Sequence, residues 1–313
     1  MSNSLRIAII QESPVYLQLK WSLEKAESLI QRAAAEKVDL IVFGETWLTG
    51  YPAWLDICPN VALWDHEPTK EVFAKMHANS ISVPSAETDL IGKWARQYGV
   101  TIVMGCNEVI KSGIGQGTIF NSILTFNNEG QLVNHHRKLM PTYTEKLLYS
   151  TGDGAGLKTV DTPFGKLGSL ICWEHWMPLT RQAMHNEGEI VHLALWPAVV
   201  DRHIWASRHY AFEGRCFVVA VGQILRVRDL PTELDLPEKL DGKPDEMILN
   251  GGSCIFDPSG HFVLQPQYNR EDIIIAEIPD LAKATRERMT LDVTGHYQRP
   301  DVFDLQVDKR RLI

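Results

Sequence analysis

A cysteine, a lysine and two glutamates lie at or just after the ends of strand-like segments, and these residue types together could perform nucleophilic catalysis. Cys172 ends KLGSLIC, Glu45 ends DLIVFGE, and Lys138 closes QLVNHHRKL shortly before Glu145. A thiol nucleophile needs a base for its proton and a group that stabilises the charge developing on the substrate. If these strands share a sheet, Glu45 and Cys172 emerge into one crevice, where backbone N–H groups can also stabilise negative charge and lower the pKa of the thiol.

Each of these residues also has an ordinary structural explanation when it is taken alone. A cysteine at the end of an apolar run is usually a small core residue. Glutamates and lysines at strand ends are commonly exposed charges. The polar residues that follow Cys172 in CWEH change this only modestly, because polar residues often follow strands. The four residues therefore indicate catalysis only as a set, and only in a fold that brings their strand ends together.

Strand-like and helix-like segments alternate in the first third of the chain. Short apolar runs have the length of strands, and apolar residues at helical spacing separate them. Their order is strand 5–11, helix 22–37, strand 39–45, helix 85–99 with Ser85 as its N-cap, and strand 100–109. This alternation predicts an α/β layered domain.

The remainder of the chain contains hairpin patterns and two strands that are apolar throughout. The hairpins are predicted over 120–139, 158–173 and 254–265, and the buried strands over 190–198 and 216–224. Residues 226–249 are rich in Pro, Asp and Glu, so we expect a surface loop there. No segment has the composition of a linker between domains.

The composition limits the classes of partner. The chain has 313 residues, of which 44% are hydrophobic and 22% charged, and its net charge is −8. This charge argues against a broad binding surface for nucleic acid or an anionic membrane. The apolar run near the N-terminus is too short for a signal-peptide core, and no stretch approaches the ~20 apolar residues that span a bilayer. We therefore expect a cytoplasmic protein with no nucleic-acid or membrane partner.

The cysteines and histidines do not have the spacing of a metal site. The five cysteines are scattered without a CxxC pair, which is usual in a reducing compartment. The eleven histidines form no HxxxH or HExxH motif, and GIGQG at 113–117 lacks the Lys-Ser/Thr of a phosphate-binding loop. We expect neither a metal nor another cofactor.

Three blocks that carry the four residues, IVFGETW, HHRKLMPTYTE and SLICWEHW, resemble the nitrilase branch of the carbon–nitrogen hydrolase superfamily. The Trp-Glu-His after the cysteine is specific, because the amidase branches usually carry other residues there. Three further stretches agree with the family: residues 152–168, 251–260 and 292–302. The resemblance runs from about residue 5 to about residue 305.

The resemblance implies an α/β fold built as a four-layer α-β-β-α sandwich with mixed sheets, in a single carbon–nitrogen hydrolase domain over residues 1–313. It also implies a homo-oligomer, because members of the family pair their sandwiches into dimers and often assemble further through the C-terminal segment. Residues 281–313 are then the candidate oligomerisation arm, with 291–307 crossing to the neighbouring subunit.

Carried over by motif, the resemblance implies a role for each of the four residues. Cys172 would be the nucleophile, Glu45 the general base, and Lys138 the cation that stabilises the tetrahedral intermediates. Glu145 would be the second glutamate, which orients Lys138 or assists proton transfer.

The sequence departs from the family pattern beside both glutamates. Gly44 stands where the family usually has proline, Thr144 where nitrilases often have histidine, and Lys146 where arginine is usual. The glutamates themselves are present.

The implied reaction is hydrolysis of an organic nitrile to a carboxylic acid and ammonia through a cysteine thioimidate and thioester. Two alternatives remain. One is a related chemistry on the same fold, such as cyanide hydratase, cyanide dihydratase or amidase. The other is a non-catalytic binding protein.

Aromatic residues after Glu45 and polar residues after Cys172 are candidates for contact with the substrate. In the family, these two regions shape the pocket, and an aromatic wall would suit aromatic, arylaliphatic or aliphatic nitriles. The expected substrate-binding residues are Trp47, Tyr51, Trp54, Trp173, Glu174, His175 and Trp196.

Overall fold

Strands that are apolar on both faces form the middle of each of two β-sheets. The computed structural model describes residues 3–313. Three parallel strands lie in the centre of the first sheet: β1 (Leu5–Gln11), β2 (Leu40–Phe43) and β3 (Thr101–Val109). Three others lie in the centre of the second: β7 (Gly165–Ile171), β8 (Val191–Leu195) and β9 (Phe217–Val221). Their continuous burial is expected of parallel strands, which are covered on both sides.

Antiparallel strands complete both sheets, which are therefore mixed. The first sheet has the order β13-β1-β2-β3-β4-β5, with β4 (Ile119–Phe126), β5 (Leu132–Arg137) and β13 (Asp272–Ile278). The second has the order β10-β11-β9-β8-β7-β6, and β12 pairs with β11. Its outer strands are β6 (Val160–Thr162), β10 (Ile224–Arg226), β11 (Met247–Phe256) and β12 (Phe262–Tyr268). The three predicted hairpins are confirmed as β4-β5, β6-β7 and β11-β12.

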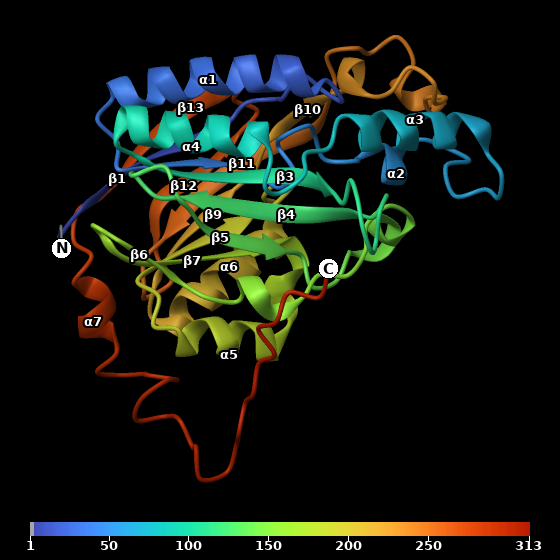
Figure 1. Ribbon diagram of the computed structural model, residues 1–313. Helices are drawn as coiled ribbons and strands as arrows, with labels where there is room; N and C mark the ends of the chain where they lie inside the picture. Colours follow the sequence, from blue (N-terminus) through green and yellow to red (C-terminus); the bar gives the residue numbers. More distant parts are fainter. Residues whose placement is uncertain (1–2) are drawn as a thin grey trace.

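Helices cover the outer face of each sheet, which gives the predicted α-β-β-α layers (Figure 1). On the first sheet lie α1 (Leu19–Ala35) and α4 (Ala86–Tyr98), and on the second lie α5 (Pro178–Asn186) and α6 (Asp201–Gly214). The predicted cap of α4 is confirmed, since Ser85 and Thr88 form a reciprocal capping box. No helix in residues 3–313 has the length and apolar character needed to cross a membrane.

A third apolar cluster lies beyond one end of the sheets and joins two segments that are distant in sequence. It contains the short helix α2 (Trp54–Ile57), the helix α3 (Glu67–Ala78) and leucines from the predicted surface loop 226–249. The helix α3 was not predicted. Between β10 and β11 the loop has no α-helix or strand and contains two 3₁₀ turns, Val227–Asp229 and Glu238–Leu240. Its first residue belongs to β10 and its last residues to β11.

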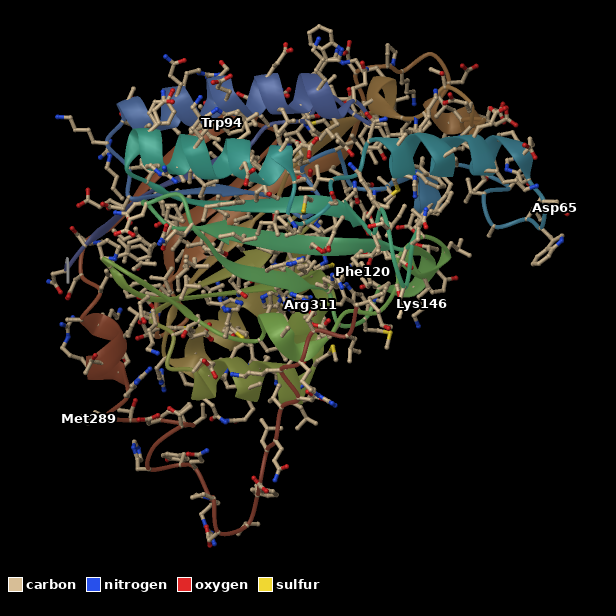
Figure 2. The ribbon with its side chains drawn as sticks, in the orientation of Figure 1. Asp65, Trp94, Phe120, Lys146, Met289 and Arg311 are labelled. Atoms are coloured by element: carbon tan, nitrogen blue, oxygen red, sulfur yellow. The ribbon has the colours of Figure 1, made fainter. Side chains whose placement is uncertain are left out.

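The C-terminal segment projects from the body of the protein and then returns to it (Figure 1). After α7 (Lys283–Glu287), the chain runs outward from Met289, and its final residues pack against the body near Arg311 (Figure 2). Arg311 pairs with Asp153 at 3.1 Å. The predicted arm, residues 281–313, thus has a projecting part and a part bound to its own subunit.

Gly105 on β3 allows the segment around Glu45 to lie close to the first sheet. A Cβ atom at this position would lie 2.1 Å from the Gly44 carbonyl oxygen and 2.7 Å from the Thr46 nitrogen. We expect Gly105→Ala to lower the free energy of unfolding by about 1–3 kcal/mol, because backbone on both sides of Glu45 must move. Cys106→Ala, at the next position of β3, is the control and should cost less. Urea unfolding measures both, and equal stabilities would contradict this account.

Candidate active site

The ends of strands β2, β5 and β7 bring the four predicted catalytic residues together. Glu45 follows β2, Lys138 follows β5, Cys172 follows β7, and Glu145 lies in the 3₁₀ turn Tyr143–Leu147. The Lys138 Nζ lies 2.9 Å from Glu45 Oε1 and 2.7 Å from Glu145 Oε2. A carboxylate oxygen of each glutamate and the Cys172 Sγ all lie within 4.8 Å of one another.

Glu45 is a buried carboxylate with one occupied and one free oxygen. Its Oε1 accepts from Lys138 and from Asn121 Nδ2 at 2.7 Å, whereas Oε2 has no hydrogen-bond partner in the described part of the chain. Gln223, at the end of β9, donates to the Glu45 backbone carbonyl at 2.6 Å and so links the second sheet to this residue. Burial raises the pKa of Glu45 to about 7, against the opposing charge of Lys138. Its free oxygen can therefore exchange a proton near neutral pH.

Lys138 supplies the positive charge between the two carboxylates. Burial disfavours its ammonium form, but the acidic groups around it, which are Cys172 once ionised, Glu45 and Glu145, outweigh burial and raise its pKa well above the usual value. Glu45, Glu145 and Cys172 are spaced as metal ligands could be. The Lys138 ammonium already donates to both carboxylates of that group.

Glu145 is held in one orientation by three donors. Its carboxylate accepts from Lys138, from the Tyr51 hydroxyl at 2.8 Å and from the Thr142 backbone N–H at 2.9 Å. Thr144, the departure from the family pattern, instead donates to Asp56 at 2.7 Å. The second glutamate is therefore oriented without help from the residue before it.

Cys172 lies at the junction of β7 and the 3₁₀ turn Cys172–Trp176. Its φ of 49° is in the left-handed region, which a non-glycine residue rarely adopts. Only 4% of the residue is accessible. Burial and the charge of Glu45 raise the pKa of Cys172 well above its usual value, against Lys138 and the Trp173 N–H. The resting sulfur is thus a thiol that needs a base.

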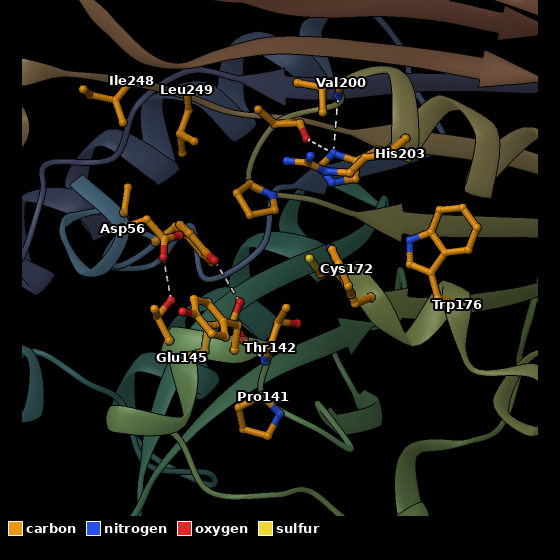
Figure 3. Close-up of a pocket in the computed structure, with 18 of the residues that line it drawn as sticks. Asp56, Pro141, Thr142, Glu145, Cys172, Trp176, Val200, His203, Ile248 and Leu249 are labelled. Carbon is orange, nitrogen blue, oxygen red and sulfur yellow. Dashed lines mark hydrogen bonds between the residues drawn. The ribbon is translucent and has the colours of Figure 1, made fainter. Parts of the chain in front are cut away.

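The Cys172 sulfur and Glu145 face a cavity of about 900 Å³ (Figure 3). Much of its lining is apolar or aromatic, and charged groups also occur there. The apolar and aromatic lining includes Tyr51, Ile57, Met140, Trp173, Trp176, Ile248 and Leu249, and the charged lining includes Asp56, Lys146 and Arg202. Ile248 and Leu249 come from the end of the predicted surface loop, which therefore reaches the cavity.

Of the seven predicted substrate-binding residues, Tyr51 and Trp173 line this cavity, and the described lining does not include the other five. Three of these are tryptophans that are fully buried behind it. Trp47 packs on Phe43 and donates to the Glu12 carbonyl, and Trp54 belongs to the third apolar cluster. Trp196 stacks on a histidine and donates to a serine hydroxyl. These three rings therefore stabilise the walls of the site instead of contacting its contents.

Glu174 and His175 also turn away from the cavity. Glu174 accepts from the Ile171 N–H at 2.7 Å and the Leu139 N–H at 2.8 Å, and so binds the residue before Cys172 and the residue after Lys138. His175 lies 2.7 Å from the Cys172 carbonyl oxygen through its Nδ1. Both side chains hold backbone next to the reacting groups.

Asn121 and Gln223 are contacts of Glu45 that the sequence reasoning missed. Asn121 is a polar residue inside the buried strand β4, and Gln223 follows the apolar strand β9. A polar side chain in or directly after a buried strand requires a partner. This requirement could have pointed to both residues from the sequence alone.

Comparison with known proteins agrees with this site. The family model described as carbon-nitrogen hydrolase matches residues 6–287. The chain belongs to the carbon–nitrogen hydrolase family. It is 38% identical over 309 residues to an aliphatic nitrilase from Sinorhizobium fredii, covering 98% of this chain and 96% of that protein. It is 37% identical to nitrilase 2 of Arabidopsis thaliana, covering 98% and 90% of the two chains. It is 36% identical to a bifunctional nitrilase/nitrile hydratase from Nicotiana tabacum, covering 97% and 86%.

Solved structures of similar proteins support the fold. A Saccharomyces cerevisiae protein of branch 10 of the nitrilase superfamily matches with a TM-score of 0.71 at 20% identity, covering 96% of this chain and 98% of that one. The NitFhit protein of C. elegans matches with the same TM-score and identity, covering 98% and 68%. The predicted family and sandwich fold are confirmed.

We expect Glu174→Gln to lower the free energy of unfolding by about 1–3 kcal/mol at pH 7, because a single amide oxygen cannot serve all the donors around Glu174. The variant also loses the negative charge that faces the His136 ring. Burial opposes ionisation of Glu174, but His136 and the two N–H groups keep its pKa below 4.5. The ionised Glu174 carboxylate therefore contributes its full stabilisation of the folded protein above pH 4.5. This contribution is lost as the pH falls through the lowered pKa of Glu174.

Urea unfolding of wild type and variant between pH 3 and pH 7 measures this effect. Glu129→Gln, on the exposed turn between β4 and β5, is the matched control. A constant difference in stability across that pH range would contradict the role of the Glu174 charge.

Proposed function

We propose that this carbon–nitrogen hydrolase is a nitrilase that converts an organic nitrile to its carboxylic acid and ammonia. The observation that carries the proposal is the Lys138 ammonium, held between Glu45 and Glu145 beside the Cys172 thiol at the wall of a cavity. The names of relatives at 36–38% identity support the same reaction.

The first step forms a covalent bond between sulfur and the nitrile carbon. Glu45 takes the proton of the Cys172 thiol as the sulfur adds, and that proton passes to the nitrile nitrogen. The product is a thioimidate. The free Oε2 of Glu45 suits this role, because its other oxygen is occupied by Lys138 and Asn121.

Two molecules of water complete the reaction. Glu45 removes a proton from the first water as the oxygen of that water adds to the thioimidate carbon. The nitrogen is then protonated, and the C–N bond breaks to release ammonia. The resulting thioester is hydrolysed by the second water, which gives the acid and restores the Cys172 thiol. Lys138 and the Trp173 N–H stabilise the negative charge of the intermediates, and Glu145 keeps Lys138 in place.

The tetrahedral intermediate can also break at sulfur, which would release an amide. Relatives named bifunctional nitrilase/nitrile hydratase favour this as a second candidate product. The apolar and aromatic part of the cavity wall suits the organic portion of an aromatic, arylaliphatic or aliphatic nitrile.

The purified protein should release ammonia and acid from at least one of phenylacetonitrile, benzonitrile and fumaronitrile, and Cys172→Ala should abolish turnover. Cys254→Ala, at a buried cysteine outside the site, is the control and should stay active. Ammonia, acid and amide are quantified separately, with cyanide and the matching amides as further substrates. Turnover of only cyanide or only amides would reject nitrile hydrolysis, and full activity of Cys172→Ala would reject the mechanism.

The value of kcat/KM should fall about tenfold per pH unit below roughly pH 7, because Glu45 must be ionised to accept a proton and burial raises its pKa to about 7. The hydrogen bond from Asn121 lowers the pKa of Glu45. Asn121→Ala should therefore move this acid limb to higher pH. Asn134→Ala, which removes a buried amide bonded to Gly156, should leave the limb in place. An unmoved limb in Asn121→Ala would argue against Glu45 as the base.

We further propose a cytoplasmic homo-oligomer, a dimer or larger, whose single domain uses the projecting segment as its inter-subunit arm. Tyr297 and Phe303 in that segment are exposed by 61% and 74%, and apolar side chains of this size favour an interface. The double variant Tyr297→Asp, Phe303→Asp should reduce the mass measured by light scattering. The control is the double variant Arg299→Ala, Asp301→Ala, which removes an exposed ion pair of the same segment. An unchanged mass in Tyr297→Asp, Phe303→Asp would reject the arm.

A further inference from the structure

A buried row of hydrogen-bonding side chains lies behind Cys172, on the side away from the cavity. His175 contacts the Cys172 carbonyl oxygen at 2.7 Å, and its Nε2 lies 3.0 Å from the Nε2 of His192. The His192 Nδ1 in turn lies 2.7 Å from Glu189 Oε2. All three side chains are almost completely buried. The reaction described above uses none of them.

Counting protons along this row shows that it carries one more than neutral imidazoles supply. The Cys172 carbonyl can only accept, so the His175 Nδ1 must carry a proton. The contact between the two Nε2 atoms needs one proton, and the contact between His192 and Glu189 needs another. Two neutral imidazoles hold two protons, whereas the three hydrogen bonds require three. The third proton lies in the contact between His192 and the Glu189 carboxylate, whose negative charge balances it.

The pKa shifts of the other two members fit this arrangement, because they keep His175 neutral and Glu189 ionised. Burial and the charge of His192 lower the pKa of His175, which keeps that ring neutral. Burial opposes ionisation of Glu189, but His192 and His185 outweigh it and lower its pKa. His192 can then donate to both His175 and Glu189, and His175 passes its remaining N–H to the carbonyl.

The Cys172 carbonyl belongs to the same peptide group as the Trp173 N–H. This group is planar and trans, so its carbonyl and its N–H point in opposite directions. Fixing the carbonyl toward His175 therefore fixes the N–H on the other side, where it interacts with the Cys172 sulfur. A hydrogen bond to the carbonyl also polarises the peptide and makes the N–H a stronger donor.

We propose that His175, His192 and Glu189 form a positioning relay, which orients and polarises the Cys172–Trp173 peptide so that the Trp173 N–H stabilises negative charge beside the nucleophile. The relay acts through the peptide and touches no substrate. The proposal rests on the proposed function only in taking Cys172 as the nucleophile. It explains why a histidine that follows the nucleophile closely in sequence faces away from the cavity.

The surroundings of the relay are polar and titratable on its outer side. Glu189 also faces His185 and accepts from the Tyr210 hydroxyl, and His185 faces Glu213. Glu213 pairs with Arg181 and lies near His209 at the surface. The rings of Trp196 and Tyr210 pack on the two relay histidines, and His203 stacks on Trp196. Within the described residues, Glu189 is the carboxylate in direct contact with His192.

The decisive variant is Glu189→Gln, which keeps the size of the side chain and removes the negative charge that faces His192. Loss of an oxyanion-hole donor costs about 10²–10³ in kcat, so loosening one should lower kcat about 10- to 100-fold, with little change in KM.

The matched control is Tyr210→Phe, which removes a different hydrogen bond to the same carboxylate and leaves its charge. Its kcat should stay within about threefold of wild type, because a lost hydrogen bond to an ion that keeps its other partners is a small change. Equal losses in Tyr210→Phe and Glu189→Gln would reduce Glu189 to a structural role and overturn the proposal. If Glu189→Gln does not fold, His192→Gln replaces the middle ring of the relay and is measured in the same way.

The rate at which iodoacetamide alkylates Cys172, followed by mass spectrometry against pH, tests the relay without any nitrile. The Trp173 N–H lowers the pKa of this thiol, so a misdirected N–H should raise it and slow alkylation at a fixed pH. If wild type hydrolyses no nitrile but alkylation slows in Glu189→Gln, the proposed function fails and the relay stands. Unchanged alkylation and unchanged kcat in the folded variant would overturn the relay.

Discussion

The site depends on one ammonium group that is buried between two carboxylates and beside a thiol. Removing Lys138, Glu45 and Glu145 from water is costly, and only their close contacts offset that cost. Burial raises the pKa of Glu45 to about 7, and the charge of Glu145 adds to this rise while Lys138 opposes it. The same burial keeps Cys172 a thiol. The acid–base properties needed for catalysis therefore come mainly from the burial of these groups around one positive charge.

The surrounding fold holds these charges in place through backbone contacts at the strand ends. Glu174 binds backbone on both the Cys172 and the Lys138 segments, and Gln223 binds the Glu45 carbonyl from the second sheet. These contacts join strands from both sheets of the sandwich. The charged centre and the packing of the two sheets thus stabilise each other, and the left-handed conformation of Cys172 is maintained by the structure around it.

The walls of the cavity and the row of histidines behind Cys172 have different tasks. The apolar and aromatic lining can receive the organic part of a substrate. The buried histidines and Glu189 lie on the opposite side of the Cys172 backbone, so they can affect charge stabilisation without affecting substrate fit. The proposed substrate contacts and the proposed relay therefore lie on opposite sides of the Cys172 backbone.

The sequence by itself determined the layered fold and the four residues at the reacting centre. Both depend on local patterns: apolar runs predict buried strands, and a polar residue directly after such a run lies at the edge of a sheet. The order of Glu45, Lys138 and Cys172 within their motifs then identified the family. The capping residue Ser85 could be predicted for the same reason, because a helix cap depends on neighbouring residues.

Only the tertiary structure decided which side chains face the cavity. Tyr51 and Trp47 are close in sequence, yet Tyr51 reaches Glu145 and Trp47 packs into the core. His175 turns away from the cavity because its partner, His192, lies on the neighbouring strand β8. The direction of a side chain and the charge that it carries depend on atoms from distant parts of the chain, and these meet only after the sheets have packed.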